Sequence, residues 1–374
     1  MRTGVPDLDD VEDLLSADSD GLLPAVALAG AQVRSVAEAV REGVAEPLAE
    51  LRPRSVVVVC SAHGPAAGAT ALVNALVAGR VDVPVVCAPG LPGWIGPLDV
   101  VVLVGDDAGD MILADAAARS LRRRAEVVVA APVEGPLRDA LGGRGINLSP
   151  RVHVDPRFRL HGYVAVIVSV LAALTRVRFA GGAPIIGELA DALDAEAAAG
   201  HPSRDTFHNQ AKLLAARLDE GPVVWTGDTP ATQQVALLAA RLLFGIAGAV
   251  CAAADLAEVT QAWQVYRTGR PGAVEASIFY DPEIDGPPTD QPPRVLVATT
   301  AAREWYTRRR VAAIPTAEII LGDAPESADP VGAGAHWVAA DPTDVPGDLG
   351  ALLVLLLRVE MAAVYLRLIG AGAR

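Results

Sequence analysis

The stretch VVLVGDDAGDMILADAAARSL, residues 101–121, decides the fold class. It begins with a continuous apolar run, passes through a short acidic loop, and continues with apolar residues at helical spacing. An apolar run without alternation is typical of a parallel strand that is buried on both faces. We therefore expect a strand, a turn and a helix here, which is the repeating unit of an α/β domain.

The same unit recurs along the chain. In the first half, apolar runs followed by turns and helical stretches are SVVVVC (55–60), VPVVC (83–87), DVVVLV (99–104) and AEVVVAA (125–131). In the second half they are GPVVWTG (221–227), IAGAVCA (246–252), EASIFY (275–280), RVLVATT (294–300) and AEIIL (317–321). Helical periodicity occupies 182–199, 204–219, 231–244 and a long closing segment, 348–369. The pattern predicts an α/β protein with two doubly wound parallel sheets and flanking helices.

These elements divide the chain into four parts. We expect an N-terminal helical segment over 1–54, a first α/β domain over 55–180, a connecting helix over 181–204, and a second α/β domain with a closing helix over 205–374.

Composition restricts the possible partners. Apolar residues make up 52% of the 374 residues and charged residues 20%, which is typical of a globular chain. The net charge is −14, so nucleic acid and anionic membranes are unfavourable partners. The acidic first 21 residues lack the apolar core of a signal peptide, and the apolar segments 162–175 and 242–254 are shorter than the ~18 residues that span a bilayer. We expect a cytoplasmic protein.

The sequence does not favour a metal or a cofactor. Cys60, Cys87 and Cys251 lie in or beside apolar runs without CxxC spacing, so we expect buried, reduced thiols. His161 and the two other histidines of this region, His201 and His208, show no spacing that would bring them to carboxylates. The loop CSAHGPAAGAT (60–70) matches neither GxGxxG nor a P-loop. We therefore expect no cofactor.

Four segments, in order, resemble the sugar isomerase (SIS) domains of bifunctional phosphoglucose/phosphomannose isomerases. They are LPGWI (91–95), DPRFRLHGY (155–163), HNQAKLLAARLDEGPVVWTG (208–227) and LLRVEMAAVYLRLIG (356–370). They resemble the family's LPxWV, QPRAALGY, NxAKxLA…PVIYG and DWVSVYLALLxG segments. The resemblance covers about residues 55 to 370 and implies two SIS domains, a sugar-phosphate ligand and a homodimer.

The loop 105–110 departs from the family where phosphate is bound. Family loops read roughly SYSGNT, and their hydroxyls and amides hold the phosphate. On this alignment Gly105 replaces the first serine, Asp107 the second and Asp110 the threonine. A carboxylate within about 4 Å of a phosphate costs on the order of several kcal/mol. The loop therefore occupies the family's phosphate-binding position, but its side chains carry negative charge. As an alternative to a phosphate group, a neutral or cationic sugar or a hydrated metal ion could bind at Asp106, Asp107 and Asp110.

The catalytic positions are altered as well. Gly248 stands where the family has its glutamate base, and Gln261 where it has the ring-opening histidine. Neither residue can exchange a proton near neutral pH. Glu258 occupies a nearby acidic position and Arg241 is retained. Arg157 matches the arginine that stabilises the enediolate, with Arg159 as a second candidate. Alternatively, Arg157 simply pairs with a carboxylate.

Two further loops are candidate ligand sites. Ser61, His63 and Gly64 follow the first strand, at the sheet edge where open α/β sheets bind ligands, and Pro65 suits the first turn of a helix. In the second domain, Thr226 and Asp228 could hydrogen-bond a sugar. Asp228 or Thr229 could equally cap a helix that begins with Pro230.

These observations leave three hypotheses. In the first, the protein binds a sugar phosphate or a related small carbohydrate and has lost most of its catalytic power. In the second, it is an active aldose–ketose isomerase for mannose 6-phosphate or glucose 6-phosphate that uses relocated groups such as Glu258, His63 or His161. In the third, it is a purely structural dimer.

Overall fold

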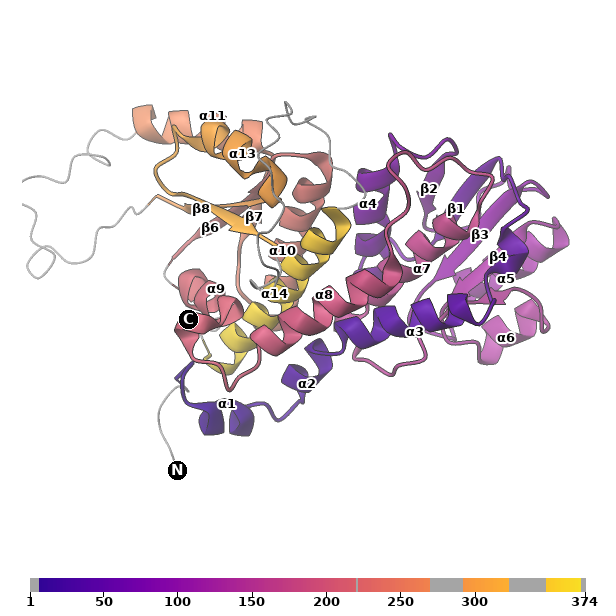
Figure 1. The fold of residues 1–374 in the computed structure, drawn as a ribbon, viewed down its shortest axis with the longest axis horizontal. Coiled ribbons are helices and arrows are strands. Elements are labelled where there is room, and N and C mark those ends of the chain that lie inside the picture. The colour runs from indigo at the N-terminus through magenta and orange to yellow at the C-terminus, as the bar shows by residue number, and fades with distance from the viewer. Residues whose placement is uncertain (1–6, 220, 270–291, 323–347, 371–374) are drawn as a thin grey trace, which may run out of the picture.

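The computed structural model describes residues 7–219, 221–269, 292–322 and 348–370, and it contains two parallel sheets (Figure 1). The first has the order β2-β1-β3-β4-β5, with β1 (Ser55–Val59), β2 (Val85–Ala88), β3 (Asp99–Val104), β4 (Glu126–Ala130) and β5 (Ile146–Asn147). The second has the order β7-β6-β8-β9, with β6 (Val223–Gly227), β7 (Ala252–Ala253), β8 (Arg294–Thr299) and β9 (Ala317–Leu321). The predicted fold class is confirmed.

Helices surround both sheets. The N-terminal segment forms α1 (Val11–Ala17), α2 (Leu22–Val26) and α3 (Ala29–Arg41). The first sheet is accompanied by α4 (Pro65–Val77), α5 (Met111–Arg122), α6 (Gly135–Leu141) and α7 (Leu160–Ala173). They are followed by α8 (Ile186–Ala199), α9 (Gln210–Asp219), α10 (Pro230–Ala247), α11 (Leu256–Gly269), α13 (Glu304–Val311) and α14 (Leu349–Leu368). The two-residue strand β5 was not predicted, and the predicted strand 275–280 lies outside the described residues.

The strands are continuously apolar because both faces of each sheet are covered. In β3, Val101 and Leu103 pack with α5 and α6, whereas Val100 and Val102 point to the opposite face. That opposite face belongs to a core shared with the second domain, because Trp225 and Leu296 of the second sheet join the same cluster.

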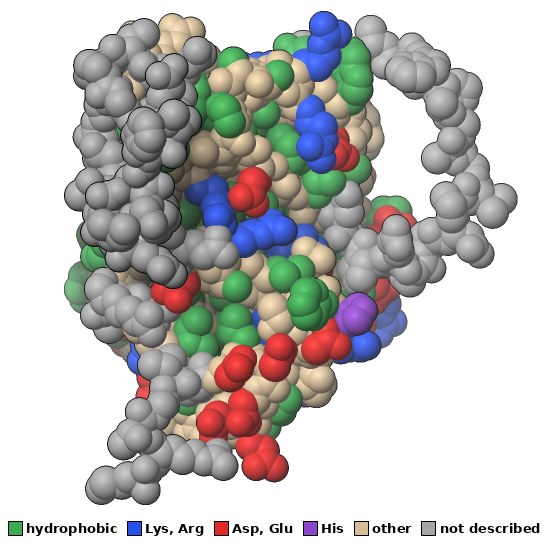
Figure 2. Space-filling view, turned by 90° about the vertical axis from the view of Figure 1, so that its left-hand side faces the viewer, with side chains coloured by type: hydrophobic (Ala, Val, Ile, Leu, Met, Phe, Trp, Pro, Cys, Tyr) green, Lys and Arg blue, Asp and Glu red, His purple; other side chains and the backbone are tan. Residues whose placement is uncertain are grey.

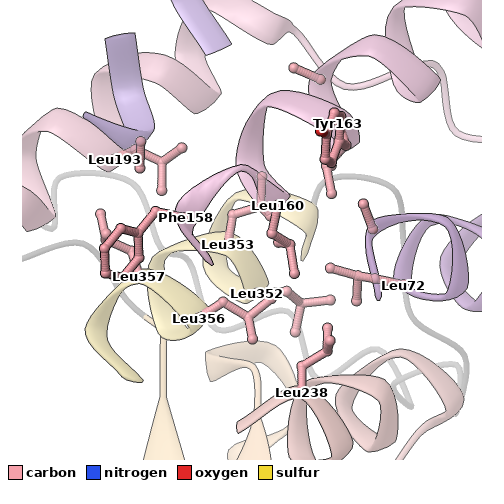
Figure 3. Packing of buried hydrophobic residues seen from close by; sticks show 14 of the residues in the cluster. Leu72, Phe158, Leu160, Tyr163, Leu193, Leu238, Leu352, Leu353, Leu356 and Leu357 are labelled. Atoms are coloured by element: carbon pink, nitrogen blue, oxygen red, sulfur yellow. The ribbon is translucent and has the colours of Figure 1, made fainter. Parts of the chain in front are cut away.

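Figure 3 shows the centre of this shared core. Leu72 of α4, Leu160 of α7 and Leu238 of α10 converge there with leucines of α14. Helices α4 and α10 approach closely at Gly68, where an added Cβ would lie 2.5 Å from Leu238 Cδ2. The two domains are therefore joined by a continuous hydrophobic core.

Helix α14 runs through the middle of the molecule, between the two sheets (Figure 1). Among the described helices it is the one that is long and apolar enough to cross a membrane, but 89% of its 18-residue apolar window is buried inside the fold. It is therefore a core helix, whose apolar side chains are covered by other parts of the fold.

Helix α14 also brings charged and titratable groups into the core. Arg358 donates two hydrogen bonds to Glu196 of α8, at 2.7 and 2.9 Å, and a third to the carbonyl of Leu321 at 2.6 Å. Glu360 lies 3.6 Å from His161 Nδ1 of α7, and both side chains are fully buried. Burial raises the pKa of Glu360 well above its usual range. Burial also lowers the pKa of His161 to about 4, so this imidazole is neutral near pH 7.

The buried Arg358–Glu196 pair yields a stability prediction. Glu196→Ala removes the carboxylate that accepts two hydrogen bonds from the largely buried Arg358 guanidinium, so we expect the free energy of unfolding to fall by about 3–5 kcal/mol. Asp191→Ala, on the same helix but in a largely exposed pair with Arg34, should change it little. Urea denaturation followed by circular dichroism measures both. Replacing Glu196 and Arg358 together by Leu and Met should recover most of the loss, and equal losses for Glu196→Ala and Asp191→Ala would contradict this account.

Candidate functional site

The carboxyl edge of the first sheet holds the predicted ligand loops. In the order β2-β1-β3-β4-β5, the direction of winding reverses between β1 and β3. Loop 61–64 follows β1 and loop 105–110 follows β3, so both lie at this reversal, the usual ligand position of open α/β sheets.

In the acidic loop, each aspartate already has a partner within the chain. Asp107 accepts a hydrogen bond from the Gly109 amide at 2.7 Å. Asp110 caps α5 by accepting from the amides of Ile112 at 2.7 Å and Leu113 at 3.3 Å. The first turn of α5, a helix start of the kind that can bind an anion, is therefore occupied by the chain's own carboxylate.

The third aspartate, Asp106, belongs to a separate cluster. It accepts hydrogen bonds from Arg159 Nη1, at 3.0 Å, and from the Tyr163 hydroxyl. Burial and the Asp106 charge raise the pKa of Tyr163. Arg159 and Tyr163 line a hollow of about 310 Å³ together with Gln32, Gly105, Ala130, Ala131, Pro132, Ser149, Pro150, Arg151, Val152 and His153. Asp106 offsets the charge of Arg159, so this hollow suits a neutral ligand better than an anion.

Loop 61–64 presents a different surface. Ser61, His63 and Gly64 are exposed, and the Ser61 hydroxyl donates to the carbonyl of His63 at 2.5 Å. Gly64 has φ +88° and ψ −173°, a backbone conformation that only glycine adopts readily. Helix α4 begins at Pro65 as predicted, and its first turn has no side-chain cap. Of the helix starts that follow β1 and β3, the one at α5 is capped by Asp110, whereas the one at α4 has no side-chain cap.

A cleft of about 220 Å³ brings loop 61–64 next to two arginines. Its walls come from α4, η2 (Pro156–Phe158), α7 and α10, and so from both domains. It is lined by Gly64, Pro65, Arg157, Leu160, Leu238, Arg241, Leu242, Gly245 and Ile246. Two guanidinium groups at the rim of a small, mostly apolar cleft can hold an anion beside an apolar surface.

Arg157 also pairs with a carboxylate, the alternative left open by the sequence. It donates to Asp155 through Nε at 2.9 Å and Nη2 at 2.8 Å, and this pairing holds the pKa of Asp155 below its usual range. The Arg157 side chain remains 36% exposed, so the pair faces solvent at the cleft. Arg157 therefore both pairs with Asp155 and lines the cleft.

The corresponding edge of the second sheet is closed by an internal ion pair. The Asp228 side chain is fully buried and accepts from Arg303 at 2.9 and 2.8 Å, as well as from Thr307 and Thr299. Thr226 is also buried. Thr229 caps α10 in a capping box with Thr232, ahead of Pro230, which confirms the capping alternative. Sugar binding by Thr226 and Asp228 stays a prediction that would require this cluster to open.

The two altered catalytic positions have structural explanations. Gly248 ends α10 in the left-handed conformation, with φ +71°, and its amide bonds back to the carbonyl of Phe244 at 2.9 Å. A glutamate would adopt that backbone only with strain. Gln261 is exposed on α11. Glu258 accepts from the Asp255 amide at 3.2 Å while its own amide donates to Asp255, so it serves the start of α11 and does not line the cleft.

The structure thus brings Arg157, Gly64 and the retained Arg241 together and leaves the other predicted residues elsewhere. His161 is fully buried against α14. Among the described residues, no group of three His, Cys, Asp or Glu side chains could hold a metal ion. Sequence reasoning missed Tyr163 and Arg303. Both lie within apolar or helical stretches, where nothing in the local pattern indicates a distant aspartate partner.

No protein-family model and no curated protein matches the chain. Solved structures share its fold at low sequence identity. A candidate phosphosugar isomerase from Bacillus subtilis is 14% identical, with 91% of this chain and 94% of that chain covered and a TM-score of 0.54. A hypothetical protein from Thermus thermophilus is 12% identical, with 96% and 88% covered and a TM-score of 0.61. A glucose-6-phosphate isomerase-like protein from the same organism is 16% identical, with 97% and 93% covered and a TM-score of 0.50.

These likenesses establish the fold. The chain has the two-domain α/β architecture of phosphosugar isomerase-like, SIS-type structures over nearly its whole length, as the sequence motifs implied. Membership of the phosphoglucose/phosphomannose branch stays a prediction.

The role of Asp110 as a helix cap is directly testable. Asp110→Ala removes the acceptor for two α5 amides, so we expect a loss of about 1 kcal/mol in the free energy of unfolding. Asp110→Asn keeps a capping oxygen and should lose much less. Chemical denaturation of the two variants beside the parent protein measures this, and equal stability of the parent and Asp110→Ala would contradict the capping role.

Proposed function

We propose that the protein binds a sugar phosphate, or a related anionic carbohydrate, in the cleft between loop 61–64 and α10, with little or no isomerase activity. The observation that carries the proposal is the placement of Arg157, Arg241 and the Gly64 turn around one cleft at the ligand edge of the first sheet. The names of the B. subtilis and T. thermophilus neighbours fit a small phosphorylated sugar.

The altered catalytic positions support the loss of activity. Aldose–ketose isomerisation needs a base that moves a proton between two carbons. The backbone at Gly248 serves to end a helix, and Gln261 cannot take up a proton. The cleft therefore offers recognition of an anion without the expected base.

Residual isomerase activity is the second candidate function, and one residue favours it. Of the three relocated candidates, His161 is buried and Glu258 serves a helix start, whereas His63 is exposed next to Gly64. Conversion of mannose 6-phosphate or glucose 6-phosphate to fructose 6-phosphate by purified protein, lost in both Arg157→Ala and His63→Ala, would favour this candidate over pure binding.

Assembly and location complete the proposal. We propose a cytoplasmic homodimer, because SIS-type sites commonly take groups from a second subunit and because Phe244, beside the cleft residue Gly245, is 64% exposed. Figure 2 shows acidic side chains gathered at the lower end of one face, where the N-terminal helices lie. Such a surface repels nucleic acid and anionic membranes. Sedimentation analysis, which measures the molecular mass in solution, tests this: we expect a dimer for the parent protein and a weaker dimer for Phe244→Ser.

The two cleft arginines should contribute directly to affinity. A hydrogen bond from a guanidinium to a phosphate contributes about 1.5–3 kcal/mol, so Arg157→Ala or Arg241→Ala should each weaken binding of mannose 6-phosphate roughly 10- to 100-fold. Titration calorimetry measures this, with Arg34→Ala, in an exposed pair away from the cleft, as the control. No stabilisation of the parent protein by millimolar sugar phosphates in a thermal-shift assay would contradict the proposal.

Restoring the family's hydroxyl residues should recover a phosphate site at α5. In the double variant Asp107→Ser, Asp110→Thr the threonine still caps the helix, so the fold is kept while two negative charges are removed. We expect affinity for sugar phosphates to rise by about tenfold or more. The double variant with Asn at both positions separates lost charge from gained hydroxyls. Unchanged or weaker binding by the Ser/Thr variant, measured by calorimetry, would argue that these carboxylates do not block an anion.

A further inference from the structure

Two cysteine thiols lie in contact at the carboxyl ends of β1 and β2. Cys60 directly follows β1 and Cys87 lies in β2, and their Sγ atoms are 3.7 Å apart. Cys60 is buried, whereas Cys87 is exposed because β2 is the edge strand of the first sheet. The expectation that all three thiols are buried is therefore confirmed for Cys60 and wrong for Cys87, and Cys251 is half-buried.

The contact makes the two thiols chemically different. A hydrogen bond from Cys60 lowers the pKa of Cys87 to about 7, and the same contact together with burial raises that of Cys60. The third thiol, Cys251, has its pKa raised to about 11 by burial. Cys87 is thus the exposed thiol with substantial thiolate at neutral pH, and the thiolate is the attacking form.

We propose that Cys87 and Cys60 form a thiol–disulfide exchange site for low-molecular-weight disulfides of the glutathione type. The Cys87 thiolate attacks one sulfur of the external disulfide, whose S–S bond breaks and releases one thiolate. Cys60 then gives its proton to solvent and attacks Cys87 Sγ, which releases the second thiolate. One external disulfide is reduced to two thiols, and Cys60 and Cys87 together lose two protons and two electrons.

The surroundings permit the second step. A disulfide requires an Sγ–Sγ distance of about 2.05 Å, so the side chains must rotate toward each other from 3.7 Å. Cys60 stands two residues beyond Val58, the partner of Cys87 in the sheet register, so the backbone at the end of β1 must also shift toward β2. Cys60 Sγ then leaves its 3.9 Å contact with the Thr70 hydroxyl. That hydroxyl already donates to the carbonyl of Ala66 at 2.8 Å, so its hydrogen bond is kept when Cys60 moves.

The bond would act on the ligand loop. Cys60 immediately precedes Ser61, and Thr70 lies on α4, whose start borders the cleft. A disulfide would tie the root of loop 61–64 to the edge strand. We therefore expect oxidation to change sugar-phosphate affinity at least about threefold, a consequence that rests on the proposed function.

The exchange itself is tested on the full chain with oxidised glutathione. After timed exposure, free thiols are alkylated and peptides are identified by mass spectrometry. We expect a Cys60–Cys87 disulfide without retained glutathione in the parent, a stable glutathione adduct on Cys87 in Cys60→Ser, and an unmodified Cys60 in Cys87→Ser. Cys251 serves as the internal reference and should react more than about tenfold more slowly than Cys87. A stable adduct on Cys87 in the parent, or equal rates at Cys87 and Cys251, would overturn the proposal.

Binding measurements separate this inference from the proposed function. Mannose 6-phosphate is titrated into reduced and oxidised parent protein, with Cys87→Ser as a variant that cannot form the bond. A disulfide that forms while neither state binds the sugar contradicts the proposed function and leaves the exchange site standing. Equal affinity in both states overturns the effect on the loop, and sugar binding without disulfide formation overturns the exchange site alone.

Discussion

The fold depends on covering helix α14 on every side. A helix that is apolar all round is stable in water only when neighbouring elements enclose it. Here α8, α9 and α10 pack against it, and its leucines meet those of α4 and α7 in one core. The two sheets are thus held at a fixed separation. The cleft between α4, α7 and α10 exists because that packing brings the edge of one domain against a helix of the other.

Enclosing α14 also dictates the state of its polar groups. Arg358 can remain charged because Glu196 and a backbone carbonyl satisfy it. Glu360 lies beside the buried His161, and neither carboxyl oxygen has a hydrogen-bond partner among the described residues. Its raised pKa reflects the large free-energy cost of a buried, unpaired carboxylate. The core therefore tolerates charge where it is paired and neutralises it where it is not.

Much of the architecture was predictable because it is local. The runs 55–60 and 99–104 specify buried parallel strands, and Thr229 followed by Pro230 specifies a helix start. The site was less predictable because it depends on contacts between distant residues. Asp228 is sequestered by Arg303, which is 75 residues away, and Cys87 is exposed only because its strand lies at the sheet edge. Strand β5 was not predictable from the sequence, because a strand of two residues is too short to show a periodic pattern.

The two sheets share a winding pattern, but the positions at their carboxyl edges where an anion could bind are occupied by different groups. At the edge of the second sheet, the buried carboxylate of Asp228 and the Arg303 guanidinium neutralise each other. At α5 in the first sheet, the chain supplies its own anion, Asp110, to the helix start. The start of α4 has no such internal carboxylate, and it faces a cleft that carries two arginines. A favourable position for an anion attracts whichever carboxylate or phosphate can reach it. An external anion therefore meets less competition at the start of α4 than at the start of α5 or at the edge of the second sheet.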